Sequence, residues 1–311
     1  MYKKFTLVLV LFLAVFSIPA QNQYSTCYTY NIKAGDEAFD QERYEDAKRF
    51  YVNASKCANP NTQEAQKKIK ECDFFLKLTA MLDCDRKGVT DYDGNTYVTI
   101  QIGNQCWMAQ NLRTKHYANG NPIPQNTDRT FSSTDAYYYD FKGKLEGDKY
   151  ISFINGFGFL YNWPAVMRGA SSSSSNPSNI QGICPYGWHL PSDAEWRELI
   201  NYLGRNSSYV CGNKSSNVAK ALSFDRFWKE SSTDCAIGND LSNNNSSYFS
   251  AVPIGSFVEG KYRSGAYLTA FWTTNSEGDK AYVRMLHHDS GEVTSKTFPK
   301  NRGFSVRCVR N

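Results

Sequence analysis

The sequence is poor in the residues and motifs that mark the common classes of enzyme. It has only four histidines, His116, His189, His287 and His288, and no His-Glu-x-x-His motif, which argues against the helical zinc site of metalloproteases. No Gly-x-Ser-x-Gly elbow and no phosphate-binding loop occur, and nothing nominates two carboxylates that face each other across a cleft. We therefore predict no catalytic residue and expect a protein that is not an enzyme.

Long hydrophobic runs are equally scarce, and the only one is residues 5–18. This run is too short for a comfortable membrane span, follows Lys3 and Lys4, and precedes a small-residue cleavage site, which is typical of a cleaved secretory signal at residues 1–20. The alternatives are an uncleaved anchor and a lipoprotein signal, although Cys27, preceded by Tyr-Ser-Thr, matches the latter poorly. Removal of two lysines lowers the net charge from +5 to 5 − 2 = +3, too little to indicate a nucleic-acid partner.

The nine cysteines include no Cys-x-x-Cys pair, which argues against a zinc ribbon and against a thioredoxin-type motif. In the oxidising compartment that a secretory signal implies, most cysteines should form disulfides. Because nine is odd, at least one cysteine stays free or pairs between chains. We expect this one to be Cys72, which lies in the middle of a predicted helix.

Residues 21–82 are the first predicted domain after the signal, and their pattern is helical. Small residues at Gly35, Ala47 and Ala54 allow two antiparallel helices to approach closely, with a turn at residues 41–43. This spacing resembles a single tetratricopeptide-repeat hairpin. A third helix should follow, with Thr62 as its N-cap.

The predicted hairpin places the start of its first helix beside the end of its second, which favours a Cys27–Cys57 disulfide. One repeat cannot bury its own faces, because solenoids need about three repeats. The helical segment is therefore either a docking groove for a peptide of a protein partner, or a small cap packed on the next domain or on another protein. We favour the cap.

The strongest local signal is a helix over residues 192–203. Ser192 is a typical N-cap residue, and Glu195 stands three positions later, which completes a capping box. Trp196 begins an apolar stripe at helical spacing, and Gly204 ends the helix. The stripe requires a surface that covers it, so this helix should pack on the core.

From Cys84 onward, the rest of the pattern is dominated by β-structure. Aromatic residues make up 15% of the sequence, and they favour strands and binding surfaces. Alternation at period two predicts an opening strand at residues 97–102, and the runs at 269–274, 280–286 and 303–309 predict a closing sheet. One main helix against antiparallel strands with long loops makes the fold class α+β.

Four blocks of sequence in this part of the chain resemble a known family. They are Asp93-Gly-Asn-Thr-Tyr97, Ile102-Gly-Asn-Gln-Cys-Trp-Met-Ala-Gln-Asn-Leu-Arg113, Cys184-Pro-Tyr-Gly-Trp-His-Leu-Pro-Ser-Asp-Ala-Glu-Trp196 and Gly303-Phe-Ser-Val-Arg-Cys-Val-Arg310. Their content and order are similar to the Fibrobacter succinogenes major paralogous domain, found in exported proteins of the Bacteroidetes–Fibrobacter group, over residues 83–311. The resemblance implies a C-type lectin-like fold, which formylglycine-generating enzymes also use. No cysteine motif of those enzymes matches this chain.

The implied fold keeps its chain ends adjacent, so the closing strand would lie beside the opening strand and place Cys308 near Cys184. We therefore predict a Cys184–Cys308 disulfide, which would contribute about 4 kcal/mol in the chain-entropy model. Cys211–Cys235 would stabilise the polar insertion at residues 206–216, and Cys84–Cys106 is the remaining expected pair.

Under the lectin-like resemblance, ligand-binding residues are expected on long loops and among exposed aromatic rings, because ring faces match the apolar faces of sugars. The candidates are Tyr137, Tyr139, Tyr248 and Tyr262. The residues assigned to the scaffold are Trp107, Trp188, Ser192, Glu195 and Trp196, with His189 as a hydrogen-bonded structural residue.

No cofactor and no metal site are predicted, although two segments carry ligand-type residues. Asp234, Asp240 and Asn243–Asn245 could line an oxygen-rich calcium loop, but a solvated loop is the commoner explanation. The lectin triplets Glu-Pro-Asn, Gln-Pro-Asp and Trp-Asn-Asp are absent. His287-His288-Asp289 could hold a metal, yet successive strand residues point to opposite faces, which argues against joint ligation.

These observations favour an exported, non-catalytic binding or adhesion module of the bacterial cell envelope, whose ligand is a glycan or an envelope protein. The alternatives are a structural envelope component without a soluble ligand, or an enzyme that acts on glycans or modifies proteins. The chain ends almost directly after its last predicted strand, so we expect no separate sorting domain. We expect a location in the periplasm or at the outer membrane and cell surface.

Overall fold

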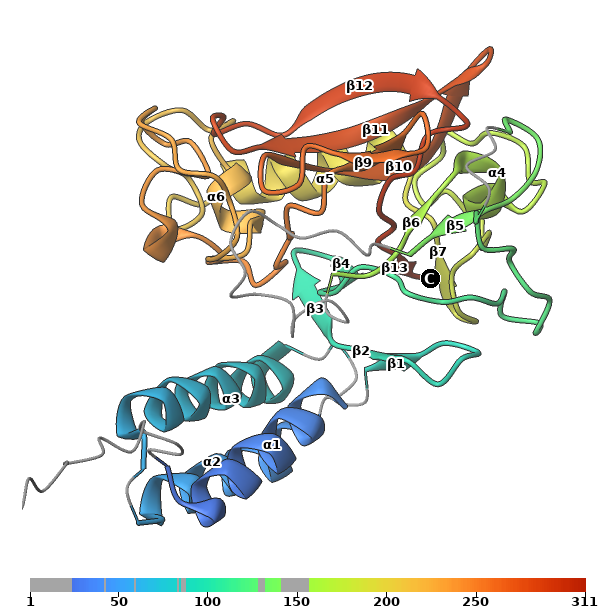
Figure 1. Ribbon diagram of the computed structural model, residues 1–311. Coiled ribbons are helices and arrows are strands. Elements are labelled where there is room, and N and C mark those ends of the chain that lie inside the picture. Colours follow the sequence, from blue (N-terminus) through green and yellow to red (C-terminus); the bar gives the residue numbers. More distant parts are fainter. Residues whose placement is uncertain are drawn as a thin grey trace, which may run out of the picture. The chain divides into compact units, whose positions relative to one another are not determined.

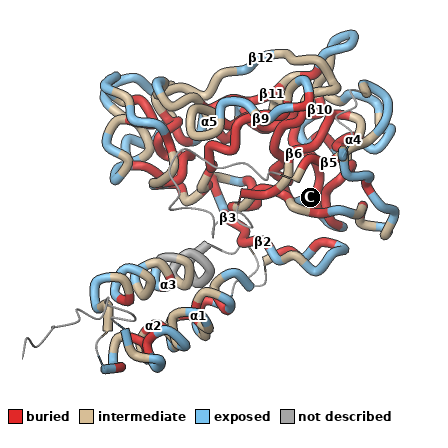
Figure 2. Tube along the Cα trace, in the orientation of Figure 1, coloured by how far each residue is buried: buried red, intermediate tan, exposed pale blue. Residues whose placement is uncertain are grey.

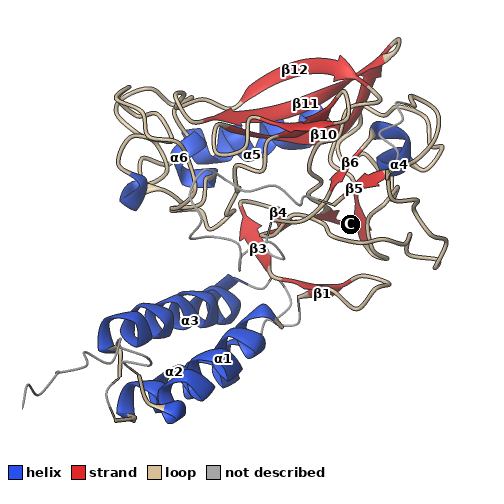
Figure 3. Ribbon diagram, viewed as in Figure 1, coloured by secondary structure: helices blue, strands red, loops and turns tan. Residues whose placement is uncertain are grey.

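The computed structural model describes residues 24–41, 43–58, 60–82, 84, 88–127, 132–140 and 157–311. The chain divides into two compact units, Met1–Phe74 and Phe75–Asn311, and each is described by itself. The predicted signal at residues 1–20 lies outside the described residues. Within them are six α-helices and several small antiparallel sheets, so the fold is mixed α+β, as the sequence predicts (Figure 3). Among the residues described, none of the helices combines the length and apolar character needed to cross a membrane.

The first unit contains helix α1 (Thr26–Asp40), helix α2 (Tyr44–Lys56) and most of helix α3 (Thr62–Leu82). The first two helices pack through small residues. Ala38, Ala47 and Ala54 are fully buried, and a Cβ atom at Gly35 would lie 2.4 Å from the Tyr51 ring. Close approach of α1 and α2 therefore depends on the small side chains in the sequence pattern.

Side-chain caps and cysteines complete this unit. The α3 helix begins at Thr62, but its cap is Asn61, whose Oδ1 accepts from the Glu64 N–H at 3.1 Å, so the prediction of Thr62 as N-cap is wrong by one residue. Cys27 and Cys57 form a disulfide. Cys72 is the one free cysteine, as expected, and burial raises the pKa of its thiol to about 12, which makes it unreactive.

The second unit is built on a three-stranded antiparallel sheet in the order β10–β11–β12. Strand β10 is Leu268–Glu277, β11 is Lys280–His287 and β12 is Thr294–Pro299. Helix α5 (Asp193–Gly204) packs against β10 and β11 (Figure 1). Figure 2 shows mostly buried residues along β10 and β11, whereas the edge strand β12 is mostly of intermediate burial and has no fully buried residue. The sequence predicts the two buried strands and misses this edge strand.

A second sheet joins the beginning of this unit to the end of the chain. Its strands are β3 (Thr99–Ile102), β4 (Gln105–Met108), β13 (Val309–Arg310) and β7 (Trp188–His189), in that order. Val309 pairs with Trp107 on one side and with His189 on the other. The closing strand therefore lies in the same sheet as β3, which holds the second half of the predicted opening strand, but β4 separates the two strands, so the expectation that they would be direct neighbours is wrong. The closing strand is shorter than the predicted 303–309, because residues 303–305 form only isolated bridges.

The remaining elements are short and are connected by long loops. They are β1 (Val89–Thr90), β2 (Thr96–Tyr97), β5 (Tyr138–Tyr139), β6 (Leu160–Tyr161), α4 (Trp163–Met167), α6 (Ala219–Leu222), η2 (Leu241–Asn243), β8 (Ser256–Val258) and β9 (Lys261–Arg263). The predicted opening strand at 97–102 is divided, because Tyr97 pairs with Val89 while residue Thr99 begins β3.

Three disulfides lie in the second unit, Cys84–Cys106, Cys184–Cys308 and Cys211–Cys235. With Cys27–Cys57, these are the four pairs expected from the sequence, and they leave only Cys72 free. Several disulfides in one chain indicate an oxidising environment outside the cytoplasm.

Candidate functional site

Helix α5 separates a closed polar network in the interior from an open pocket on its outer side. On the inner side, Ser192 Oγ accepts from the Glu195 N–H at 3.2 Å, and the Glu195 carboxylate accepts from the Ser192 N–H at 2.9 Å. This is the capping box that the sequence predicts. The same carboxylate accepts from the Ser178 N–H at 3.0 Å. These groups are buried and satisfy one another, so they hold the helix start and do not face a ligand.

His189 belongs to the same network. Its Nε2 lies 2.5 Å from Glu195 Oε1, and its Nδ1 lies 2.7 Å from Asn311 Oδ1. Burial by itself lowers the pKa of His189, but the hydrogen bond and charge of Glu195 and the bond to Asn311 raise it, and the net shift is upward. Both ring nitrogens have hydrogen-bond partners, so the His189 ring connects α5 to the chain end.

Arg307 lies at the centre of the unit and is only 1% exposed. Its guanidinium donates to four neutral acceptors, Asn111 Oδ1 (2.7 Å) and the carbonyl oxygens of Met108 (3.0 Å), Phe249 (2.5 Å) and Ser250 (3.0 Å). It also lies over the rings of Phe249 and Phe271, at 4.6 and 5.5 Å from their centroids. Burial lowers the pKa of Arg307 to about 9, so the group remains charged at neutral pH. Arg307 therefore connects three segments of the scaffold.

The core around Arg307 contains the tryptophans that the sequence assigns to the scaffold. The rings of Trp107 and Trp196 are 4.9 Å apart, and both contact Phe249. Trp107 donates from Nε1 to Gln105 Oε1 at 3.1 Å. Trp188 is also buried. The inner face of α5 is therefore fully covered.

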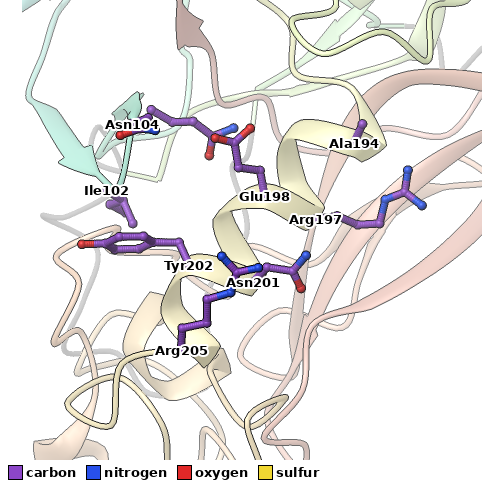
Figure 4. A pocket seen from close by; sticks show the side chains of 9 residues that line it. Ile102, Asn104, Ala194, Arg197, Glu198, Asn201, Tyr202 and Arg205 are labelled. Atoms are coloured by element: carbon purple, nitrogen blue, oxygen red, sulfur yellow. The ribbon is translucent and has the colours of Figure 1, made fainter.

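The outer face of α5 borders an open pocket of about 510 Å³. The polar side chains that line it include Asn104, Arg197, Glu198, Asn201 and Arg205, together with the ring of Tyr202. In Figure 4, the Tyr202 ring lies beside Ile102, while Arg197 points away from it. The pocket thus combines an aromatic ring with hydrogen-bond donors and acceptors.

The ring of Tyr202 packs against the β3–β4 turn. The residue is 42% exposed, and its ring packs on Gly103, where a Cβ atom would lie 2.8 Å from the ring. Gly103 has φ +62°, a conformation that glycine adopts without strain. The glycine therefore allows the ring to lie against the turn and keep one side exposed to solvent.

Among the residues that the structure describes, the charged side chains that line this pocket form no ion pairs with one another. Arg197 Nε lies 3.7 Å from Asp193, and Glu198 Oε2 accepts from Asn176 Nδ2 at 2.7 Å. Arg205 has no ion-pair partner among the residues that the structure describes. The pocket therefore offers a guanidinium group for a ligand.

Tyr202 also leads to a second pocket, of about 610 Å³, between the polar insertions at 206–216 and 239–247. Tyr209 lines this pocket, and its ring centroid is 6.5 Å from that of Tyr202. The pKa of Tyr209 is raised, chiefly by burial and then by the neighbouring Tyr202 and Tyr248. The contact between Tyr202 and Tyr209 thus links the two pockets.

The calcium-type loop lies at the second pocket, but its oxygens are largely engaged. The Lys220 ammonium donates to the carbonyl oxygens of Ala236 (3.3 Å), Asn239 and Asp240 (3.0 Å). The Asp240 carboxylate accepts from Ser242 Oγ and from Asn243 Nδ2, at 2.6 and 2.5 Å. A lysine cation therefore already binds carbonyl oxygens that a calcium ion would use, and calcium binding stays a prediction without geometric support.

The four tyrosines predicted as sugar platforms do not form one exposed surface. Tyr139 is 1% exposed and stacks on Phe257 at 4.1 Å, so its ring face is covered. Tyr262 contacts the same Phe257 ring edge-on and donates to the Asp140 carbonyl. Tyr137 and Tyr248 are half-buried, and Tyr248 lies close enough to Tyr209 to raise its pKa. Ligand binding by these tyrosines stays a prediction.

The structure brings His287, His288 and Asp289 together, against the expectation of opposite faces. Strand β11 ends at His287, and His288 lies in the following turn, so the alternation of a strand no longer applies. The two imidazole rings are 4.9 Å apart. The pKa of Asp289 is lowered, mainly by its hydrogen bond from His287.

Sequence reasoning missed the outer pocket and Arg307. Glu198, Asn201, Tyr202 and Arg205 recur at spacings of three and four residues on the side of α5 opposite Trp196. The one sequence feature that could have indicated the pocket is Tyr202, a large aromatic residue among these polar positions. For Arg307 no local signal distinguishes a buried from an exposed arginine.

A model of the Fibrobacter succinogenes major domain matches residues 100–310 of the chain. The match spans more than half of the sequence, so the chain belongs to this family. It includes β3 from its second residue onward, strand β4, helix α5 and the closing strand β13. No curated protein and no solved structure matches the sequence.

Proposed function

We propose that this member of the Fibrobacter succinogenes major domain family is an exported, non-catalytic glycan-binding module of the cell envelope. The outer face of α5 is its binding surface. The observation that carries the proposal is the open pocket in which the Tyr202 ring lies beside Asn201, Arg205 and Glu198. Glu198 and Asn201 lie on α5 and Arg205 is its C-cap residue, so the helix fixes their spacing.

The chemistry of the pocket suits a sugar better than an apolar ligand. Its volume lies within the range of about 300–1,000 Å³ that small-molecule sites occupy. A tyrosine ring offers an apolar face for the C–H side of a pyranose at low entropic cost. The planar groups of arginine, asparagine and glutamate can pair with neighbouring hydroxyl groups, and Arg205 also suits a carboxylate of an acidic sugar.

The proposal also includes a more specific fold for each of the two units. The domain is a relative of the C-type lectin-like fold, in which the chain ends meet in one sheet and long loops carry the ligand. The pairing of β13 between β4 and β7, and the insertions beside Tyr209, support this assignment. The helical unit is a tetratricopeptide-like hairpin that serves as a cap or tether, supported by the small residues between α1 and α2.

Location follows from the same reasoning. A cleaved signal at residues 1–20 would direct the chain to the periplasm or to the outer membrane and cell surface, where four disulfides are stable. Fractionation of cells with an antibody against the chain, with and without surface proteolysis, separates the two locations.

A glycan array probed with the disulfide-bonded chain tests the proposal, followed by calorimetric titration of each glycan that binds. Tyr202→Ala and Arg205→Ala should each weaken binding by about tenfold, which corresponds to about 1.4 kcal/mol. Tyr186→Ala is the matched control, because Tyr186 is 69% exposed and does not line the pocket. Binding that Tyr202→Ala leaves unchanged would place the ligand elsewhere. An array on which nothing binds would favour a structural envelope component or a protein ligand.

A further inference from the structure

Three side chains with metal-ligand chemistry converge at the end of β11, away from the residues that line either pocket. His287, His288 and Asp289 each offer one ligand atom, and these atoms all lie within 4.8 Å of one another. The His287 and His288 ring centroids are 4.9 Å apart, and His287 Nδ1 is hydrogen-bonded to Asp289 Oδ1. Two imidazoles and a carboxylate are the ligands of many divalent transition-metal sites.

The backbone holds this turn on two sides. The His288 N–H donates to the Tyr267 carbonyl at 2.8 Å, and the His288 carbonyl accepts from the Gly238 N–H at 2.7 Å. The turn is closed by the Ser290 N–H, which donates to the His287 carbonyl at 3.0 Å. The convergence of the side chains is therefore built on a fixed backbone, which reduces the entropy that metal binding would otherwise cost.

His288 carries a second, independent indication of a ligand. Its Nδ1 atom is buried and has no hydrogen-bond partner among the residues that the structure describes. A buried polar atom without a partner costs free energy, and native structures leave few of them unexplained. A metal ion bound at the histidine pair would account for the orientation of the His288 ring.

We propose that His287, His288 and Asp289 together bind one divalent transition-metal ion, with zinc as the representative ion. The metal replaces the hydrogen bond between His287 Nδ1 and Asp289 Oδ1, and each imidazole binds it as a neutral ring through the nitrogen that carries no proton. Water fills the remaining positions, since three protein ligands leave a zinc ion an open coordination position.

The geometry can accommodate the ion after a small adjustment. Ligand atoms around tetrahedral zinc are about 3.3 Å apart when the bonds are about 2.0–2.1 Å, so the present span of up to 4.8 Å must contract. The side chains of His287 and Asp289 are 38% and 55% exposed, which gives them room to rotate and gives the ion a path of entry. The proposal does not rest on glycan binding.

Calorimetric titration of the full, disulfide-bonded chain without a histidine tag, with zinc chloride as the probe, tests the site. We expect one saturable site per chain. His287→Ala, His288→Ala and Asp289→Asn should each weaken zinc binding at least tenfold, which corresponds to about 1.4 kcal/mol or more.

The matched control is His116→Ala. His116 Nδ1 lies 2.5 Å from Asp93 Oδ1, so it has the same histidine–aspartate pairing. Among the described residues, the only metal-type cluster is that at 287–289, so His116 should not affect zinc binding. Zinc binding that is lost in His116→Ala and retained in His287→Ala would overturn the proposal, as would the absence of saturable binding to the wild-type chain.

Thermal unfolding provides a second readout and separates loss of the site from loss of the fold. Zinc should raise the Tm of the wild-type chain and of His116→Ala, because a ligand that binds only the folded state stabilises it. The metal-free Tm of His287→Gln should stay close to that of the wild type, because the side chain is half-exposed. A zinc-induced rise in Tm that persists fully in His287→Gln, with its metal-free fold intact, would also refute the site.

Discussion

The two sides of helix α5 carry similar residue types in different surroundings, buried on the inner side and open to solvent on the outer side. On the inner side, Glu195 binds two backbone N–H groups and a histidine, and every partner is buried. On the outer side, Glu198 lies in an open pocket and binds only the exposed Asn176 amide among the described residues. The same contrast separates two arginines, since Arg307 has four neutral acceptors in the core and Arg205 faces the pocket.

This contrast teaches which groups hold the fold and which can act on a ligand. A buried polar group whose partners are all within the protein contributes to stability, and its removal leaves the partners unsatisfied. An exposed group contributes little to stability, because water replaces its partners. Substitutions in the inner network should therefore lower the stability of the fold. Substitutions on the outer surfaces, which include the α5 pocket and the turn at His287, should change stability little.

The largest effect should follow from opening the Cys184–Cys308 disulfide, which joins the start of the α5 segment to the closing strand. A Cys184→Ser, Cys308→Ser double variant should lower the free energy of unfolding by about 4–5 kcal/mol, because the bond spans 124 residues and constrains the unfolded chain. The matched control is Cys211→Ser, Cys235→Ser, which opens a span of 24 residues and should cost about 3.5 kcal/mol. Urea denaturation measures both. A larger loss of unfolding free energy in the control variant would contradict the assignment of the inner side of α5 as the main support of the fold.

Removal of the Arg307 guanidinium should have the next largest effect. Arg307→Met keeps an apolar chain of similar length but leaves four buried acceptors unsatisfied, so we expect a loss of about 3 kcal/mol in the free energy of unfolding. Arg205→Met, on the outer side, should change stability by no more than about 0.5 kcal/mol. Equal losses in the two variants would show that the inner network contributes nothing beyond packing.

Local signals in the sequence were enough to predict the inner side. The capping box and the tryptophan stripe of α5 depend on residues three or four positions apart, and such spacings are read directly from the chain. The pairing of Cys184 with Cys308 followed from the order of the strands, which the family resemblance supplied. Each of these features is specified by short-range pattern or by topology.

The outer surfaces could not be predicted in the same way. The α5 pocket needs the β3–β4 turn to pass beside Tyr202, a contact between segments about 100 residues apart whose register no local pattern encodes. The His287–His288 pair depends on the residue at which β11 ends, and strand ends are the least predictable boundaries. Arg307 lies in one of the four family-like sequence blocks, but the burial of a charged residue depends on acceptors from distant loops.

The smallest effect should be the pH dependence that His189 gives to stability. Its folded-state pKa is raised above the ordinary value of about 6.5, so the folded state binds the proton more tightly than the unfolded chain. This contribution is fully present below about pH 6.5 and is lost as the pH rises through the raised pKa. The free energy of unfolding should therefore fall over that interval, and urea denaturation at a series of pH values measures the slope. His189→Gln should flatten it, whereas His116→Gln, at the half-exposed pair with Asp93, should leave the His189 contribution in place. An unchanged slope in His189→Gln would mean that the ring binds its proton equally well in the folded protein and in the unfolded chain, which would contradict the raised pKa.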